Sequence, residues 1–94
     1  MKNLRISQDV MDKLTHKHRV SRAEVEQCFY NRTGGLLTDL RAKHKSNPPT
    51  LWFLAQTNNG RTLKILYIHN VPCIDLRSAF EPNATEKEIY LKHG

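Results

Sequence analysis

The residues best suited to chemistry in this 94-residue chain are cations grouped around one predicted β-sheet. They lie on a loop, beside a hairpin tip and on a strand face: Arg41, Lys43, His44, Lys45, Arg61, Lys64 and Arg77. Cations beside an exposed aromatic side chain, here Trp52, can hold phosphates and stack a base. The pattern therefore indicates binding of nucleic acid.

These residue types also match what RNA cleavage without a metal requires. That reaction needs a base near the 2′-hydroxyl, cations for the charged phosphorane and an acid for the leaving group. His44 could serve as acid or base, while the other cations stabilise charge. We expect catalytic roles for His44, Arg61, Lys64 and Arg77, and RNA contacts from Trp52, Arg41, Lys43 and Lys45.

A structural alternative stands beside this interpretation. Lys64 and Arg77 could pair with Asp75 on a solvated face, and Trp52 could pack under a neighbouring helix.

No other chemistry has support in the sequence. His16 and His18 are two residues apart, and the remaining histidines lie on separate predicted elements, without His-x-x-x-His or paired cysteines. A metal site is therefore not expected. Neither a Gly-rich phosphate loop nor a nucleophile elbow is present, so no cofactor is expected.

The net charge of +6 is uneven along the chain. Residues 1–64 hold 12 Lys and Arg against 5 Asp and Glu, whereas residues 65–94 hold 3 against 4. A basic front part suits an anionic partner, either nucleic acid or an acidic protein. No run approaches the roughly 20 apolar residues of a membrane span, and the start lacks a signal-peptide stretch. We expect one cytoplasmic domain over 1–94 with no membrane contact.

Residues 50–80 hold three β-rich runs separated by two turns, a pattern typical of an antiparallel meander. Gly60 in the first turn can take positive φ because it lacks a Cβ. A two-residue loop would mix polar and apolar side chains on both faces. A three-residue loop gives one apolar face. The register that we predict pairs Ala55 with Leu63, Phe53 with Ile65 and Leu51 with Tyr67.

The third run could place its apolar side chains on the same face if the alternation of side chains between the two faces shifts by one residue at the second turn. Ile74, Leu76 and Phe80 would then lie on that face. The opposite face would be half apolar and half charged, and would turn toward water: Trp52, Leu54, Gln56, Thr62, Lys64, Leu66, Asp75 and Arg77. This second face is where we expect the site.

Helices are predicted both before and after the meander along the sequence. Ser7 caps a helix that ends at about His16, and Ser21 with Glu24 forms a capping box for a second helix. Asn83 or Thr85 starts the last helix. With short strands at 2–6 and 36–40, the order is β-α-α-β-β-β-β-α. This predicts a single small α+β domain, in which the helices cover one face of a three-stranded meander with one or two further strands.

Several short motifs resemble the BrnT-type toxins. Lys17-His18, Val20-Ser21, Glu24-Val25 and Phe29 are similar to the family's Lys-His-Gly-Val-Ser-Phe-Glu-Glu opening, with Arg19 in place of its glycine. Gly60-Arg61, Ser78-Ala79 and the late Glu88 and Tyr90 continue the resemblance in the same order. The resemblance implies a RelE-like ribonuclease fold, RNA lying on the sheet and neutralisation by an antitoxin.

A second, shorter resemblance involves Pro-Pro-Thr-Leu-Trp-Phe at 48–53. Chains with this run are similar to a small group often labelled ADP-ribosyl-(dinitrogen reductase) hydrolase. Enzymes of that name are large helical domains with clustered Asp and Mg²⁺, which the four scattered Asp residues here do not match.

Two functional hypotheses follow. The leading one is a toxin-type domain that binds RNA on its sheet face and acts as a metal-independent endoribonuclease. The alternative is a binding module for protein or nucleic acid that has lost cleavage activity.

Overall fold

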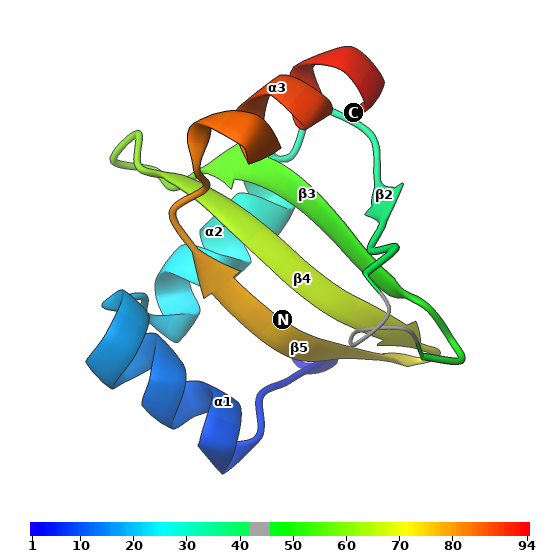
Figure 1. Ribbon diagram of the computed structural model, residues 1–94. Helices are drawn as coiled ribbons and strands as arrows, with labels where there is room; N and C mark the ends of the chain where they lie inside the picture. The colour runs from blue at the N-terminus through cyan, green and yellow to red at the C-terminus, as the bar shows by residue number, and fades with distance from the viewer. Residues whose placement is uncertain (42–45) are drawn as a thin grey trace.

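The elements of the fold follow the predicted order along the chain (Figure 1). The structure, a computed structural model, describes residues 1–41 and 46–94. Its elements are β1 (Leu4–Arg5), α1 (Gln8–Lys13), the π-helical turn η1 (Leu14–His18), α2 (Arg22–Asn31), β2 (Leu37–Thr38), β3 (Thr50–Gln56), β4 (Thr62–Asn70), β5 (Cys73–Phe80) and α3 (Ala84–His93). The predicted α+β domain with two N-terminal helices and one C-terminal helix is confirmed.

The sheet has five strands in the order β1-β5-β4-β3-β2, mostly antiparallel, with β1 parallel to β5. The predicted β3–β4 register is confirmed, including the pair Phe53 and Ile65. The backbone N–H of Thr57 donates to the carbonyl of Arg61 at 2.8 Å, which leaves three residues in the loop. Gly60 has φ of +83°, the positive-φ conformation that was predicted for this position of the three-residue loop.

The pairing of β4 with β5 contains an irregularity. Leu66 pairs with Ser78, and the next residue, Tyr67, pairs with Leu76. Arg77 is thus an extra residue in β5, and such a bulge changes which side chains face which side. Beyond the bulge Ala79 enters the core, whereas Phe80 lies across from Lys64 on the other face. The prediction that Phe80 joins the apolar core face is therefore wrong.

Local capping explains where the helices begin. Ser7 accepts a hydrogen bond from the backbone N–H of Val10 at the start of α1. Ser21 and Glu24 form the predicted capping box of α2, and Asn83 forms a capping box with Glu86 at the start of α3. Each of these hydrogen bonds satisfies a backbone donor that has no partner within the helix.

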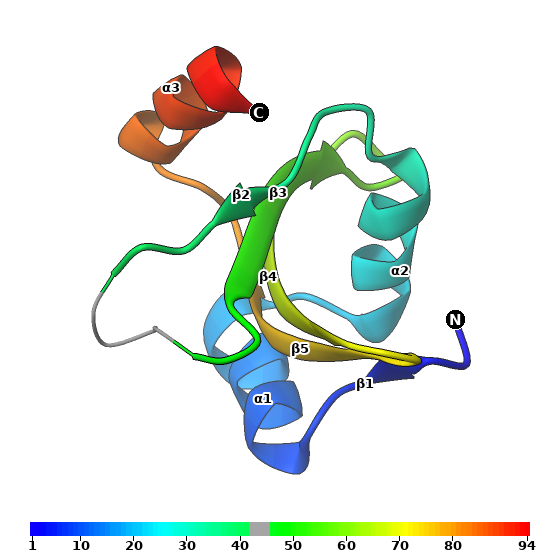
Figure 2. The ribbon, with the colours of Figure 1, turned by 90° about the vertical axis from the view of Figure 1, so that its right-hand side faces the viewer.

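The two faces of the sheet have different covers (Figure 2). α2 packs on the face that holds the fully buried Phe53, Leu63 and Ile65. α3 lies against the opposite face, so the prediction that all helices cover one face is wrong for α3. Trp52, expected to face water, is only 6% exposed beneath it. Among the described residues, no helix has the length and apolar character needed to cross a bilayer.

Gly60 allows a direct test of the hairpin loop. Apart from its two chain neighbours, no described residue has an atom within 4 Å of a Cβ placed there, so Gly60→Ala changes only the backbone preference. We expect the positive φ to lower the free energy of unfolding by about 1 kcal/mol, measured by urea denaturation. Gly60→Asn, which tolerates this conformation better, should lower it less. Unchanged stability of the alanine variant would contradict the assigned loop.

Candidate functional site

A cleft of about 960 Å³ lies on the face of the sheet that α2 leaves free. Its floor is apolar and comes from the β1–α1 connection, α1, β4 and β5: Ile6, Val10, Leu66, Ile68, Leu76 and Phe80. Five Lys and Arg side chains line it: Arg5, Lys13, Lys17, Arg41 and Arg77. Asp9 and Asp75 are the acidic residues of the lining. The cleft therefore combines an excess of positive charge with an apolar surface.

Two of the cations are held by carboxylates. Arg41 donates to both carboxylate oxygens of the buried Asp39 at 3.0 Å, and Arg5 is paired in the same two-pronged way with Asp75. This arrangement fixes the plane of a guanidinium group. Lys13, Lys17 and Arg77 form no ion pair within 1–41 and 46–94. Their charges are free to meet an anion.

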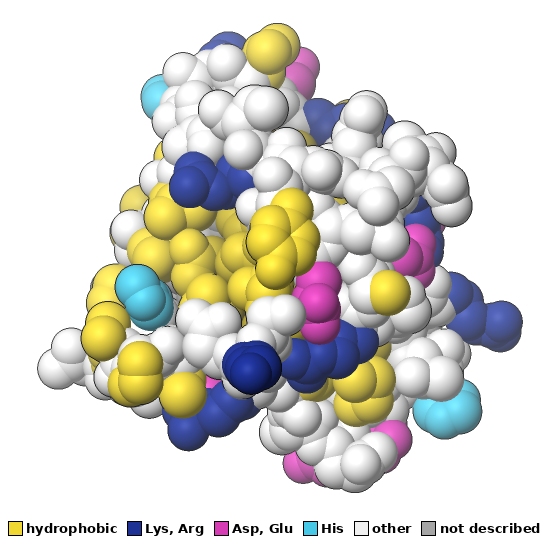
Figure 3. Space-filling model, turned by 180° about the vertical axis from the view of Figure 1, so that it is seen from behind, with side chains coloured by type: hydrophobic (Ala, Val, Ile, Leu, Met, Phe, Trp, Pro, Cys, Tyr) yellow, Lys and Arg dark blue, Asp and Glu magenta, His cyan; other side chains and the backbone are white. Residues whose placement is uncertain are grey.

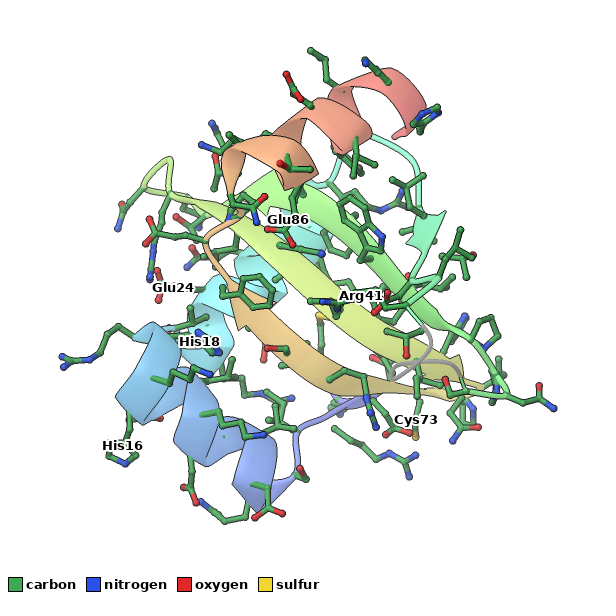
Figure 4. The ribbon with its side chains drawn as sticks, in the orientation of Figure 1. His16, His18, Glu24, Arg41, Cys73 and Glu86 are labelled. Carbon is green, nitrogen blue, oxygen red and sulfur yellow. The ribbon has the colours of Figure 1, made fainter. Side chains whose placement is uncertain are left out.

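His18 is a functional candidate that the motif reasoning did not assign to the site. Its half-buried ring lies 5.3 Å from the ring of Phe80, centroid to centroid, at the cleft wall. Figure 4 shows it turned toward the sheet, whereas His16 points outward. Burial, together with the charges of Lys17 and Lys13, lowers the pKa of His18 below its ordinary value. The imidazole is therefore mostly neutral at pH 7 and can accept a proton.

The predicted pair Trp52 and Lys64 lies under α3 and outside the cleft lining. Lys64 is 5% exposed, and its ammonium sits 4.4 Å from the Trp52 ring centroid and 2.5 Å from a carboxylate oxygen of Glu86. Tyr90 of α3 packs beside Trp52, with its ring centroid 5.7 Å from that of Trp52. Trp52 thus packs under a helix, as in the structural alternative, and Lys64 pairs with Glu86 and not with Asp75.

Arg61 joins two parts of the fold. Its guanidinium donates to the carbonyls of His18 at 3.1 Å and Arg19 at 2.7 Å, and it also pairs with Glu24 at 3.1 Å. Arg19 has φ of +56°, so the turn after η1 takes the left-handed shape at the position of the family's glycine. These contacts give Arg61 a structural role, and its predicted catalytic role stays a prediction.

The remaining predicted residues divide into two groups. Arg41 and Arg77 lie at the cleft, where the structure brings them together with His18. Lys43, His44 and Lys45 lie outside the described residues, so their roles in RNA binding and catalysis stay predictions. His18 could have been found from spacing: it follows the buried Leu14 by four residues and is preceded by Lys13 and Lys17.

The face of the molecule opposite to the view of Figure 1 carries hydrophobic side chains that gather on one side of it (Figure 3).

Within the described part of the chain, no group of three or more His, Cys, Asp or Glu side chains could hold a metal ion.

Comparison with known proteins adds no relative. No protein-family model, curated protein or solved structure matches the chain. The resemblance to the BrnT-type toxins stays a prediction.

The structural role of Arg61 predicts a large effect on stability. Arg61→Ala leaves two carbonyls and Glu24 without their donor, so we expect the free energy of unfolding at pH 7 to fall by about 2–3 kcal/mol. Urea denaturation measures this change. Arg5→Ala, which breaks an exposed ion pair, should have far less effect. Equal effects of the two substitutions would contradict the role.

The same contact predicts a dependence on pH. Burial raises the pKa of Glu24, but hydrogen bonds from the Ser21 backbone and Arg61 outweigh it and hold that pKa below its ordinary value. A lowered pKa stabilises the fold above the unfolded value of about 4.3, and this contribution is lost as pH falls through the folded value. The stability difference between wild type and Arg61→Ala should therefore shrink below about pH 4. A stability difference that stays constant down to pH 2 would contradict a stabilising contact between Arg61 and the ionised Glu24.

Proposed function

We propose that the cleft binds single-stranded RNA and that His18 acts there as the base of a metal-independent cleavage. The observation that carries the proposal is the combination in one cleft of five Lys and Arg side chains with an apolar floor containing Phe80. Single strands are bound by surfaces of this composition, because cations follow the phosphates while bases stack on aromatic rings. The resemblance to ribonuclease toxins supports the same class of ligand.

The cations are distributed so that a strand can run along the cleft. Lys13 and Lys17 come from α1 and η1 on one side, and Arg41 comes from the β2 side. Arg77 lies between them in β5. A backbone laid over β4 and β5 would therefore meet positive charge on both walls and on the floor.

The bases have an aromatic surface to meet. The rings of His18 and Phe80, which both line the cleft, are inclined at 36° to one another. A base can stack on Phe80, which is half-buried and keeps part of its surface exposed. Stacking of this kind contributes about 1–3 kcal/mol per base and tolerates any sequence.

The proposed reaction uses the neutral form of His18. The imidazole takes the proton of a 2′-hydroxyl, and the 2′ oxygen attacks the adjacent phosphorus. The bond to the 5′ oxygen breaks, and this oxygen leaves with a proton from solvent. The products are a 2′,3′-cyclic phosphate and a 5′-hydroxyl. Lys17 and Arg77 are placed to stabilise the charge that develops on the phosphorane.

The apolar floor favours one further candidate, a module without catalysis that binds protein. Three half-buried aliphatic side chains of the lining suit an apolar stripe on a partner such as an antitoxin: Ile6, Val10 and Ile68. An acidic amphipathic segment would satisfy both the floor and the cations. This module would cleave no RNA, and its affinity would depend weakly on salt.

Charge-matched variants test RNA binding. Lys17→Gln with Arg77→Gln removes two phosphate contacts, so we expect about tenfold weaker binding of a labelled single-stranded RNA by fluorescence anisotropy. The slope of log affinity against log salt should become shallower by about 1.4, because each contact contributes about 0.7. Lys2→Gln with Lys92→Gln makes the same change in net charge at exposed residues outside the cleft lining and should change neither quantity. Equal losses of RNA affinity in the two double variants would rule out the cleft as the RNA-binding site.

The pH profile tests the base. In single-turnover cleavage followed on a denaturing gel, the rate should fall as His18 becomes protonated, with a midpoint below about 6.5. His18→Gln should remove the activity, while His16→Gln, at an exposed position on the same turn, should keep both rate and profile. Full activity of the His18 variant would exclude it as the base.

A further inference from the structure

Glu86 pairs with the buried Lys64 and lies within the electrostatic influence of Arg41. Its Oε2 atom is 2.5 Å from the Lys64 ammonium, and its Oε1 accepts a hydrogen bond from the N–H of Asn83. Burial raises the pKa of Glu86, but the bonds from Lys64 and Asn83 and the charges of Lys64 and Arg41 hold it below its ordinary value. Figure 4 shows Glu86 and Arg41 over the same face of β4, reaching in from different elements.

This point is continuous with the cleft. Lys64 pairs across the sheet with Phe80, which lines the cleft, and its ammonium lies 5.8 Å from the Phe80 ring centroid. Arg41 also lines the cleft. The place that Glu86 fills is therefore the α3 end of the surface on which we propose that RNA lies.

We propose that Lys64 and Arg41 form a phosphate subsite at this end of the cleft, which the carboxylate of Glu86 occupies in the conformation described. A backbone phosphate of bound RNA competes with Glu86 for these two cations. The inference rests on the proposed RNA binding and adds to it a residue that limits affinity. Carboxylate and phosphate oxygens form the same kind of charged hydrogen bond with ammonium and guanidinium groups, so one can replace the other.

The packing of α3 is compatible with such a replacement. No residue of α3 is buried, and Leu91 is 87% exposed. Besides the Glu86 ion pair, α3 contacts the rest of the fold through Tyr90, whose ring lies beside Trp52 and whose hydroxyl donates to the carbonyl of Gly35 at 2.7 Å. The first turn can therefore withdraw its carboxylate without uncovering the core behind the sheet.

The arrangement also explains the placement of Trp52. The Lys64 ammonium lies over its ring, and this cation–π contact holds the charge at the subsite when Glu86 is removed. Trp52 thus positions Lys64 and does not stack a base.

Glu86→Gln is the sharpest test, because Gln keeps the size of the side chain and its one carbonyl oxygen can keep the capping bond from the Asn83 N–H. It removes the charge that competes with phosphate, together with the bond to Lys64. We expect a labelled single-stranded RNA to bind about five- to tenfold tighter in fluorescence anisotropy. The salt dependence should become steeper by about 0.7, the value for one added phosphate contact.

Glu88→Gln provides the matched control. It makes the same change in net charge on the same helix at an exposed residue, so it should alter neither the affinity nor the slope. Equal affinity and slope for the two variants would overturn the subsite while leaving RNA binding by the wild type intact. Wild-type protein that binds no RNA would overturn the proposed function, and the subsite with it.

Thermal unfolding checks that the Gln variant is folded, since it leaves Lys64 buried without its ion pair. If it unfolds, Glu86→Asp keeps the charge and draws it back by one methylene, so affinity should rise by a smaller factor. Glu88→Asp is its control. No gain from Glu86→Asp over this control would overturn the subsite.

Discussion

The pairing of β4 with its two neighbours decides which side chains face α2 and which face the cleft. On one side the three-residue loop sets the register with β3, and on the other side the bulge at Arg77 sets the register with β5. Because side chains alternate along a strand, a slip of one residue would exchange the two faces. The apolar face then serves the core, and the cations above β4 and β5 remain on the surface where an anion can reach them.

The bulge links the fold to the proposed function. It adds one residue to β5, which places Arg77 in the cleft and turns Phe80 away from the core. Bulges are frequent beside functional sites, where they redirect a side chain. The second irregular feature is the π-helical turn that carries His18, and π-turns have the same tendency. The two irregular segments meet where the rings of His18 and Phe80 approach each other.

The sequence predicts the local parts of this structure better than the contacts between distant parts. Turn chemistry and alternation were sufficient for the pairing of Phe53 with Ile65, and capping boxes marked the starts of α2 and α3. The turn of Phe80 away from the core could not be predicted, because no residue type near Arg77 demands a bulge. The cover over Trp52 depends on long-range contacts of Glu86 and Tyr90, which composition and spacing do not specify. Arg41 and Arg77 line the cleft and their functional roles stay predictions, whereas the position of His18 depends on a tertiary contact with Phe80 that spacing does not specify.

We propose that RNA lies over β4 and β5 between η1 and the β2 side. Titration of the ¹⁵N-labelled protein with a short single-stranded RNA, followed by amide chemical shifts, tests it most directly. The account predicts that the largest shifts fall on η1, on β5 around the bulge and on the neighbouring part of β4. Shifts confined to α2 and the face that it covers, or the absence of any shift at high RNA concentration, would contradict it.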